Sequence, residues 1–430
     1  MRIIIKNFAK ISHADIKIDG ITVIAGNNNT GKSTVGKVLD SMFYVGKDLD
    51  RKMENARVRR LARSLSQKFV QESAKEIYGG AGRYYPLEVF LRLSAQVLNL
   101  PEAERAEILH KFFYEQYLRN VHEKTEADSI FIEQLCRSVR EIEQIPEDML
   151  CRGIYTGYFG DVFHKQINSI YEEEQTAEIL LQIKGKEIHL LFEKDECIHC
   201  ERQLDLLNSS VYIDNPFVLD YLNNISLYSS MELPVMEENL CKKLLEKEDR
   251  GVEEAALDEL LINERMKDIM EILNQVAAGQ MTHRQRYMYH LPEETALELD
   301  IASLSTGLKA FVILKQLLLN GSLQEKDVIV LDEPEIHLHP EWQMIYAQII
   351  VLLQKRFHFH IIITTHSSHF MEAVELFSKK YETEAQCRYY LTRQQEKGIF
   401  FEEVTGELEK IYKQMVSPAL LLEYLREELA

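Results

Sequence analysis

One short segment has the residue types and spacing of a phosphate-binding loop. It fits the pattern GxxxxGK[ST], and it lies between an apolar run at residues 21–25 and a helical pattern that begins at Ser33. In such a loop the backbone N–H groups and the helix N-terminus surround a phosphate, while Lys32 can reach the β- and γ-phosphates and the Ser33 hydroxyl can bind Mg²⁺. The expected phosphate-binding residues are Gly26, Asn27, Asn28, Asn29, Thr30, Gly31, Lys32, Ser33 and Thr34. In this context the spacing favours nucleotide binding over a glycine-rich turn with a chance lysine.

Two adjacent carboxylates follow another apolar run. Residues 328–331 have the composition of a buried strand, and Asp332 and Glu333 come directly after it. Because the carboxyl ends of parallel strands face the ligand crevice, we expect Asp332 to hold Mg²⁺ through water and Glu333 to polarise an attacking water. Taken alone, the pair is also typical of a solvated acidic turn. Together with the phosphate loop, it favours a hydrolytic site.

The elements that must position these residues follow from hydrophobic periodicity. Three short extended patterns occupy the first 25 residues, and the pattern from about residue 47 to 175 is mostly helical. Residues 177–193 are typical of a β-hairpin, and residues 237–278 return to helical periodicity. Strand, helix and strand then alternate in the last third of the chain, at residues 328–331, 341–354 and 361–365.

That alternation is the mark of a parallel α/β sheet. We therefore expect an α/β fold built on a parallel P-loop sheet, interrupted by a large insertion. The discontinuous head would comprise residues 1–45 and 280–430. Residues 46–279 would form the insertion, mostly helical and containing the β-hairpin.

The composition argues against several classes of protein. The 430 residues carry 69 acidic and 50 basic side chains, a net charge of −19, so the molecule as a whole does not attract nucleic acid or an anionic membrane. No apolar run approaches the roughly 20 residues needed to cross a bilayer, and the N-terminus becomes polar too early for a signal peptide. Six cysteines at irregular spacing predict no disulfide framework, as is typical of a reducing compartment. We expect a cytoplasmic protein that does not bind membranes.

Three further segments resemble the motifs of one ATPase family. Residues 304–309, LSTGLK, are similar to the signature motif of the ATP-binding-cassette (ABC) ATPase head, and residues 364–367, TTHS, are similar to its switch-histidine loop. Residues 334–340, PEIHLHP, resemble the PExxLHP stretch that follows Walker B in OLD-like ATPases. With the phosphate loop, or Walker A, the set resembles the head of AAA-family ATPases of the SMC, RecF and OLD-like group. The likeness covers about residues 1–45 and 280–405.

The resemblance implies ATP and Mg²⁺ as cofactors, and it assigns roles to single residues. Two heads would sandwich two ATP molecules in a homodimer or higher oligomer. Ser305 and the backbone near Gly307 of one subunit would cap the γ-phosphate bound in the other subunit's phosphate loop. Glu333 and His366 would be catalytic, with His366 contacting the γ-phosphate and helping to orient the water.

The chain departs from the family pattern in two places. Its signature reads LSTGLK instead of LSGGQ, a form closer to SMC-like and OLD-like ATPases than to transporters. The Q-loop glutamine has no counterpart in the nearest equivalent segment, residues 212–216. The residue that couples nucleotide to lobe motion is therefore unassigned.

Two weaker patterns lie in the expected insertion. Arg59, Arg60 and Arg63 would share one face of a basic helix and could contact the phosphates of DNA or RNA. The alternative is a solvated helix or a docking face for an acidic partner. Cys197 and Cys200 form one CxxC, which resembles the zinc hook of a coiled-coil repair ATPase but supplies only two thiolates. Here the alternative is a pair of free thiols.

Three biological settings compete for this head. Only 64 residues follow His366, too few for the TOPRIM nuclease domain of OLD-like proteins, so we expect any nuclease to be a separate chain. The preferred hypothesis is a sensor ATPase that regulates such an effector in anti-phage defence, similar to the Septu or PARIS type. The alternatives are a RecF-like DNA repair or maintenance ATPase, and a non-hydrolysing ATP-bound scaffold that restrains a toxin.

Overall fold

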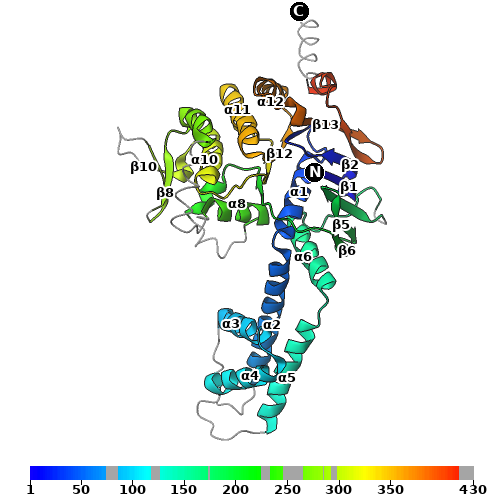
Figure 1. Cartoon of the computed structure of the whole chain (residues 1–430), viewed down its shortest axis with the longest axis vertical. Helices are drawn as coiled ribbons and strands as arrows, with labels where there is room; N and C mark the ends of the chain where they lie inside the picture. The colour runs from blue at the N-terminus through cyan, green and yellow to red at the C-terminus, as the bar shows by residue number, and fades with distance from the viewer. Residues whose placement is uncertain are drawn as a thin grey trace, which may run out of the picture. The chain divides into compact units, whose positions relative to one another are not determined.

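The computed structural model separates the chain into two compact units (Figure 1). The head unit comprises residues 1–47 and 155–430, and the helical unit comprises residues 48–154. The residues that the structure describes are 1–73, 86–117, 126–172, 175–223, 233–245, 265–283, 285–291 and 298–415.

A sheet of eleven strands forms the centre of the described part of the head unit, in the order β6-β5-β4-β1-β2-β14-β13-β3-β12-β11-β7. A second sheet holds β10, β9 and β8. The strands are β1 (Arg2–Phe8), β2 (Ile11–Lys17), β3 (Ile21–Ala25), β4 (Ala177–Ile183), β5 (Lys186–Glu193), β6 (Glu196–Arg202), β7 (Ser210–Ile213), β8 (Gln280–His283), β9 (Tyr287–His290), β10 (Glu298–Asp300), β11 (Val328–Asp332), β12 (His360–Thr365), β13 (Cys387–Gln395) and β14 (Gly398–Glu403).

The large sheet has two halves that differ in strand direction. Strands β13, β3, β12, β11 and β7 pair in parallel and form what we call the parallel half. Strands β6, β5, β4, β1 and β2 pair antiparallel and form the antiparallel half. Strand β14 joins them, because it pairs antiparallel with β13 and parallel with β2.

The central strands of the parallel half are apolar and almost wholly buried. All of β3 is buried, as are all but one residue each of β11 and β12. Continuous apolar runs of this kind are expected where helices cover both faces of a parallel sheet. Helices α10 (Thr306–Leu319), α11 (Pro340–Phe357) and α12 (Ser368–Lys380) share the main hydrophobic core with these strands, and α1 (Lys32–Gly46) packs against β7, β11 and β12.

The helices of the head unit are α1 (Lys32–Gly46), α7 (Val218–Leu222), α8 (Val235–Leu245), α10 (Thr306–Leu319), α11 (Pro340–Phe357) and α12 (Ser368–Lys380). Residues 265–276 are also helical. Helix α6 (Glu147–Val162) contains the division between the two units.

Strands of the antiparallel half alternate instead between buried and partly exposed residues. In β5, for example, Ile188, Leu190 and Phe192 are buried, while His189 and Leu191 are only half-buried. Alternation with a period of two places one face of a strand on the core and the other toward solvent. The antiparallel half therefore carries its polar side chains along the faces of its strands.

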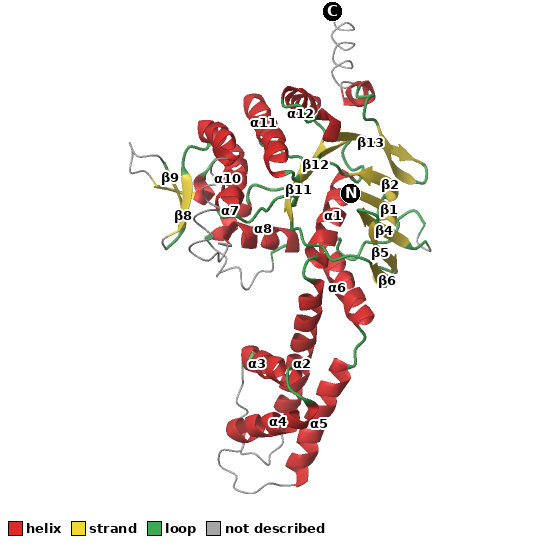
Figure 2. Cartoon of the chain, viewed as in Figure 1, coloured by secondary structure: helices red, strands yellow, loops and turns green. Residues whose placement is uncertain are grey.

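The described part of the helical unit consists of helices and loops (Figure 2). Its helices are α2 (Leu49–Ser73), α3 (Leu87–Leu98), α4 (Glu102–Tyr117), α5 (Glu126–Glu143) and the start of α6. Their apolar faces meet in a core separate from that of the head, in which Phe131 lies with its ring centroid 5.4 Å from Phe69 and 5.0 Å from Phe113. Aromatic packing of this kind can hold a small helical core together.

The expected α/β fold class with a helical insertion is confirmed, and the large sheet is mixed, with a parallel and an antiparallel half. The hairpin expected at residues 177–193 is present as β4 and β5. The structure divides the chain elsewhere than at the expected boundaries, because residues 155–279 contribute β4, β5, β6 and β7 to the head's own sheet. Of the expected insertion, only residues 48–154 form a unit apart from the head.

Candidate nucleotide site

The predicted phosphate-binding loop connects β3 to α1. Two glycines permit its path: Gly26 has φ 154° and Gly31 has φ 71°, values that residues with a Cβ rarely adopt. A Cβ at Gly26 would also lie 1.8 Å from Thr392 Oγ1. Thr30 fixes the loop from within, because its hydroxyl donates to the Asn27 carbonyl at 2.7 Å and accepts from Thr392 at 2.8 Å.

The Lys32 ammonium lies in the mouth of this loop with only 3% of its side chain exposed. It donates to the carbonyls of Gly26 at 3.1 Å and Asn27 at 2.9 Å, and lies 3.5 Å from Glu333 Oε1. A buried cation requires such partners, because burial removes its hydration. The lysine is therefore held at the loop by acceptors that a phosphate oxygen can replace.

Asp332 ends β11 and collects three hydroxyl groups. Its Oδ1 accepts from Ser33 at 2.9 Å and from Thr364, and its Oδ2 accepts from Tyr212 at 2.6 Å. Ser33 and Asp332 are thus brought together although 299 positions separate them. Hydroxyl and carboxylate oxygens are the ligands that Mg²⁺ prefers, so the residues present fit a magnesium site.

Glu333 and His366 come from adjacent loops, after β11 and β12. His366 Nδ1 is 3.5 Å from Glu333 Oε1. Glu333 has a left-handed backbone with φ 50°, and its N–H donates to the Thr364 carbonyl at 3.0 Å and hydroxyl at 3.1 Å. The tether to β12 keeps this uncommon conformation in place. One carboxylate oxygen of Glu333 therefore faces both the Lys32 ammonium and the His366 ring.

Glu335 is a residue to which we assigned no role from sequence. It is 3% exposed, and its Oε1 accepts from the Thr365 hydroxyl at 2.5 Å and from the His366 N–H at 3.2 Å. Its Oε2 has no hydrogen-bond partner in the described structure. Burial raises the pKa of Glu335, against the opposing bond from Thr365. The carboxyl group fixes the backbone that carries His366, and its place in the PEIHLHP stretch was the only signal for it.

Tyr212 is a second residue without an expected role. It lies on β7, beside β11, and 3% of it is exposed. Burial, and then the carboxylates of Asp332 and Asp214, raise the pKa of Tyr212 well above its ordinary value, so its hydroxyl keeps its proton and donates to Asp332. The segment containing it was singled out only because it lacked the Q-loop glutamine.

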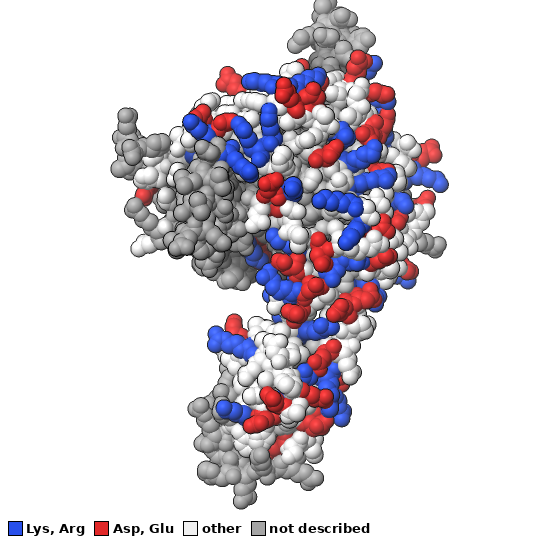
Figure 3. All heavy atoms as spheres, viewed as in Figure 1, with Lys and Arg blue, Asp and Glu red and all other residues white. Residues whose placement is uncertain are grey.

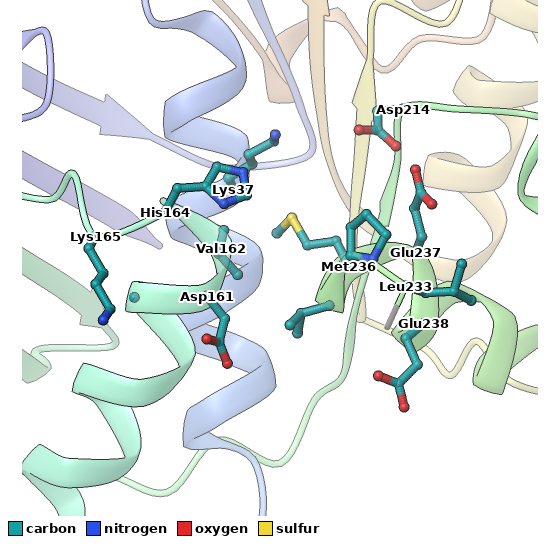
Figure 4. Close-up of a pocket in the computed structure, with 13 residues that line it drawn as sticks. Lys37, Asp161, Val162, His164, Lys165, Asp214, Leu233, Met236, Glu237 and Glu238 are labelled. Atoms are coloured by element: carbon teal, nitrogen blue, oxygen red, sulfur yellow. The ribbon is translucent and has the colours of Figure 1, made fainter. Parts of the chain in front are cut away.

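A cavity of about 1030 Å³ lies at the C-terminal end of β7, where Asp214 forms part of its lining. In Figure 4, Lys37, His164 and Lys165 lie on one side of it, and Asp214 and Glu237 lie on the other. Burial raises the pKa of Asp214, and the positive charge of Lys37 opposes the shift. The Lys37 ammonium also lies 5.7 Å from the centre of the Tyr212 ring. Lys37 therefore connects the lining of this cavity to Tyr212, which donates to Asp332.

The signature segment begins α10. Ser305 is the exposed N-cap residue of this helix, and its side chain accepts from the Leu308 N–H at 3.4 Å. Gly307 is buried where a Cβ would approach the His337 carbonyl to 3.0 Å. No hydrogen bond of the described chain joins Ser305 or Gly307 to residues 26–34. Their expected contact with nucleotide across a dimer stays a prediction.

The basic residues expected to meet nucleic acid lie on α2 of the helical unit. Arg59, Arg60 and Arg63 are all exposed, which leaves the prediction open. On the face of the head unit seen in Figure 3, Lys and Arg alternate with Asp and Glu, so the described part of this face offers no continuous basic surface.

Of the expected CxxC, Cys197 is buried with its thiol donating to the His199 carbonyl at 3.2 Å. Cys200 is disulfide-bonded, so the alternative of two free thiols is wrong and the pair does not offer two thiolates for zinc.

Comparison with known proteins identifies one family. A family model described as an AAA ATPase domain matches residues 1–371. A search of curated proteins finds no match.

Solved structures of SMC head domains are also similar. The head from Thermotoga maritima is 12% identical, with 94% of this chain and 98% of that chain covered and a TM-score of 0.38. An Smc head bound to the C-terminal domain of ScpA derived from Pyrococcus furiosus is 12% identical, with 99% and 98% covered and a TM-score of 0.40. Likenesses this distant carry no functional conclusion. Within the described residues, no helix is long and apolar enough to cross a membrane.

Proposed function

Because the chain belongs to the AAA ATPase-domain family, we propose that it binds Mg²⁺-ATP at residues 26–34 and hydrolyses it with Glu333 and His366. The observation that supports this most directly is a convergence of side chains. The Lys32 ammonium and the His366 ring lie 3.5 Å from the same oxygen of Glu333, and Asp332 beside it accepts from Ser33.

Lys32 has a different partner before and after phosphate arrives. In the structure its ammonium lies against Glu333 and two loop carbonyls. A triphosphate oxygen carries more charge than a carbonyl and forms a stronger bond with an ammonium. When Lys32 turns to the phosphate, the carboxylate of Glu333 is freed to accept a proton from water. Ser33 and Asp332 would hold Mg²⁺, which supplies charge neutralisation at the β- and γ-phosphates.

His366 and Glu333 share the chemical step. Glu333 would take the proton of the attacking water, while His366 would donate to an oxygen of the transferred phosphoryl group. Glu335 supports this arrangement because it bonds the backbone N–H of His366. The two reacting side chains are thus placed by neighbouring strands of one rigid sheet.

We also propose that ATP closes two heads into a homodimer. Helix α10 begins after the exposed Ser305, and the buried Gly307 lies in its first turn; this N-terminus is suited to cap an anion, because helix N–H groups there lack intrahelical acceptors. In a dimer these groups would meet the γ-phosphate held by the loop of the other subunit. Hydrolysis would then remove the γ-phosphate that both subunits contact, and the dimer would dissociate.

Glu333→Gln tests the chemistry and the dimer together. Removing the general base should lower phosphate release by about 100-fold or more while ATP binding persists. Size-exclusion chromatography with light scattering should show an ATP-dependent dimer of the variant. Glu396→Gln, in the exposed turn between β13 and β14, is the matched control and should behave as wild type. An unaltered turnover rate in Glu333→Gln would refute the assignment.

For the biological setting, we propose that the ATPase controls a separate effector, such as a nuclease, in anti-phage defence. The PEIHLHP stretch after Asp332 supports this through its resemblance to OLD-like ATPases. Capture of tagged Glu333→Gln protein from its own host, with mass spectrometry and sequencing of bound nucleic acid, tests the idea. A stoichiometric nuclease supports it. Bound DNA without a dedicated protein partner would favour the repair alternative instead.

A further inference from the structure

Two histidines and a glutamate lie together on the solvent-facing side of the antiparallel half. His189 of β5 is directly opposite Glu201 of β6, and Leu191 is opposite His199. Since residues two apart on a strand share a face, His199 and Glu201 lie on the face that carries His189. One nitrogen or oxygen atom from each of the three lies within 4.8 Å of the others.

These groups do not satisfy one another by hydrogen bonding. His199 Nε2 is 3.9 Å from Glu201 Oε2, beyond hydrogen-bond distance, and the rings of His189 and His199 are edge to face with centroids 5.5 Å apart. The side chains of His199 and Glu201 are 45% and 51% exposed, which leaves the cluster accessible from solvent. The described hydrogen bonds of the cluster run to residues outside it, as from Gln203 to Glu201 Oε1 at 3.1 Å.

A fourth residue, Glu178 of β4, orients one of the histidines. Its Oε1 lies 2.9 Å from His189 Nε2, and its Oε2 accepts from the Lys6 ammonium at 2.7 Å. A carboxylate bonded to one imidazole nitrogen, leaving the other for a metal, is the usual support of metal-binding histidines.

We propose that His189, His199 and Glu201 form a binding site for a divalent transition-metal ion, with Zn²⁺ as the best fit. Two imidazoles and one carboxylate match zinc sites that keep the fourth position for water, whereas Mg²⁺ and Ca²⁺ prefer oxygen ligands alone. Ligands at about 2.0–2.1 Å from a tetrahedral ion lie roughly 3.4 Å apart. The ligand atoms lie within 4.8 Å of one another in the structure, and rotation of the three side chains, without movement of the strands, would bring them to this separation.

A metal ion at this site would stabilise the pairing of the edge strand β6 with β5. Strand β6 is the terminal strand of the antiparallel half, and it pairs on one side with β5. An ion held by His189 of β5 and two residues of β6 crosslinks this edge strand to its neighbour. A ligand that binds only the folded chain also stabilises it by mass action. The inference is independent of the proposed ATPase function, because β5 and β6 lie at the opposite end of the sheet order from β11.

The test is metal binding by the full-length protein after treatment with chelator and desalting, with excess Mg²⁺ present. Calorimetry with Zn²⁺ should show one ion per chain, and Co²⁺ should produce the visible ligand-field bands of a low-coordinate site. His199→Ala and Glu201→Gln should lose this binding. Glu178→Gln should weaken it about 10- to 100-fold, as loss of an orienting carboxylate does. Zn²⁺ should raise the Tm of the wild type but not that of His199→Ala or Glu201→Gln.

His290→Ala is the matched control. His290 is also 45% exposed and lies 3.5 Å from a glutamate, but it belongs to β9 of the small sheet. This variant should bind Zn²⁺ as the wild type does. The proposal is overturned if the wild type binds no Zn²⁺, or if His199→Ala and Glu201→Gln retain stoichiometric binding. A thiolate-to-cobalt charge-transfer band would place the ion at cysteines and overturn it as well.

Discussion

The two halves of the large sheet place their polar side chains in different ways. In the parallel half, strands such as β3 and β11 are buried, and the polar residues follow at the strand ends, where Ser33, Asp332 and Thr364 meet. In the antiparallel half the polar residues lie along the strand faces and pair with neighbours across the ladder, as Arg2 does with Asp15. A buried polar network depends on each of its members, whereas a partly exposed ion pair contributes about 1 kcal/mol or less.

The largest difference between the two halves is expected when one lysine in each is replaced and kcat/KM for ATP is compared. Lys32→Ala removes the buried ammonium at the phosphate loop and should lower kcat/KM for ATP by about 100- to 1,000-fold. Lys6→Ala removes the ammonium that bonds Glu178 in the antiparallel half and should leave kcat/KM unchanged. Phosphate release and calorimetric ATP binding, measured for both variants, check this pair. An equal loss of kcat/KM in the two variants would show that the two halves do not differ in their importance for ATP hydrolysis.

A second test concerns the buried carboxyl group of Asp40 on α1. Burial raises the pKa of Asp40 to about 6, against an opposing hydrogen bond from Ser210. Because the folded chain holds this proton more tightly than the unfolded chain, the free energy of unfolding falls as the pH rises from about 4 to 6. The loss at pH 7 is about 3 kcal/mol.

Asp40→Asn should remove that loss. The variant should be more stable than the wild type at pH 7, by up to about 3 kcal/mol, and should lose this advantage near pH 4. Urea unfolding at both pH values measures the difference. An advantage that is the same at the two pH values would show that ionisation of Asp40 is not its cause.

The smallest of these effects is expected for Tyr212→Phe, which keeps the ring and removes only the hydroxyl. Asp332 then loses one of its three donors, and the affinity for Mg²⁺ in the presence of ATP should fall by about tenfold. The Mg²⁺ dependence of phosphate release measures it. Tyr390→Phe is the control, because its hydroxyl accepts from the Lys17 N–H outside the nucleotide site. A shift of equal size in Tyr390→Phe would assign the effect to packing.

Much of the candidate nucleotide site could be predicted because its parts are local patterns. The loop around Lys32 is contiguous in sequence, and Asp332 and Glu333 directly follow an apolar strand pattern. These signals depend only on spacing and hydrophobicity within a few residues. Glu335 and Tyr212 escaped assignment because neither stands out within its own segment.

The sequence by itself determined the glycine loop between β3 and α1, the strand–helix–strand alternation and the hairpin of β4 and β5, since each is a pattern within a short stretch. Only the tertiary structure decided that this hairpin extends the head's own sheet, through pairing of β4 with β1. It likewise decided that Tyr212 reaches Asp332 and that Glu335 holds the backbone of His366. The physical reason is that strand order and register depend on burial across the whole sheet, and no local pattern encodes which distant strand becomes a neighbour.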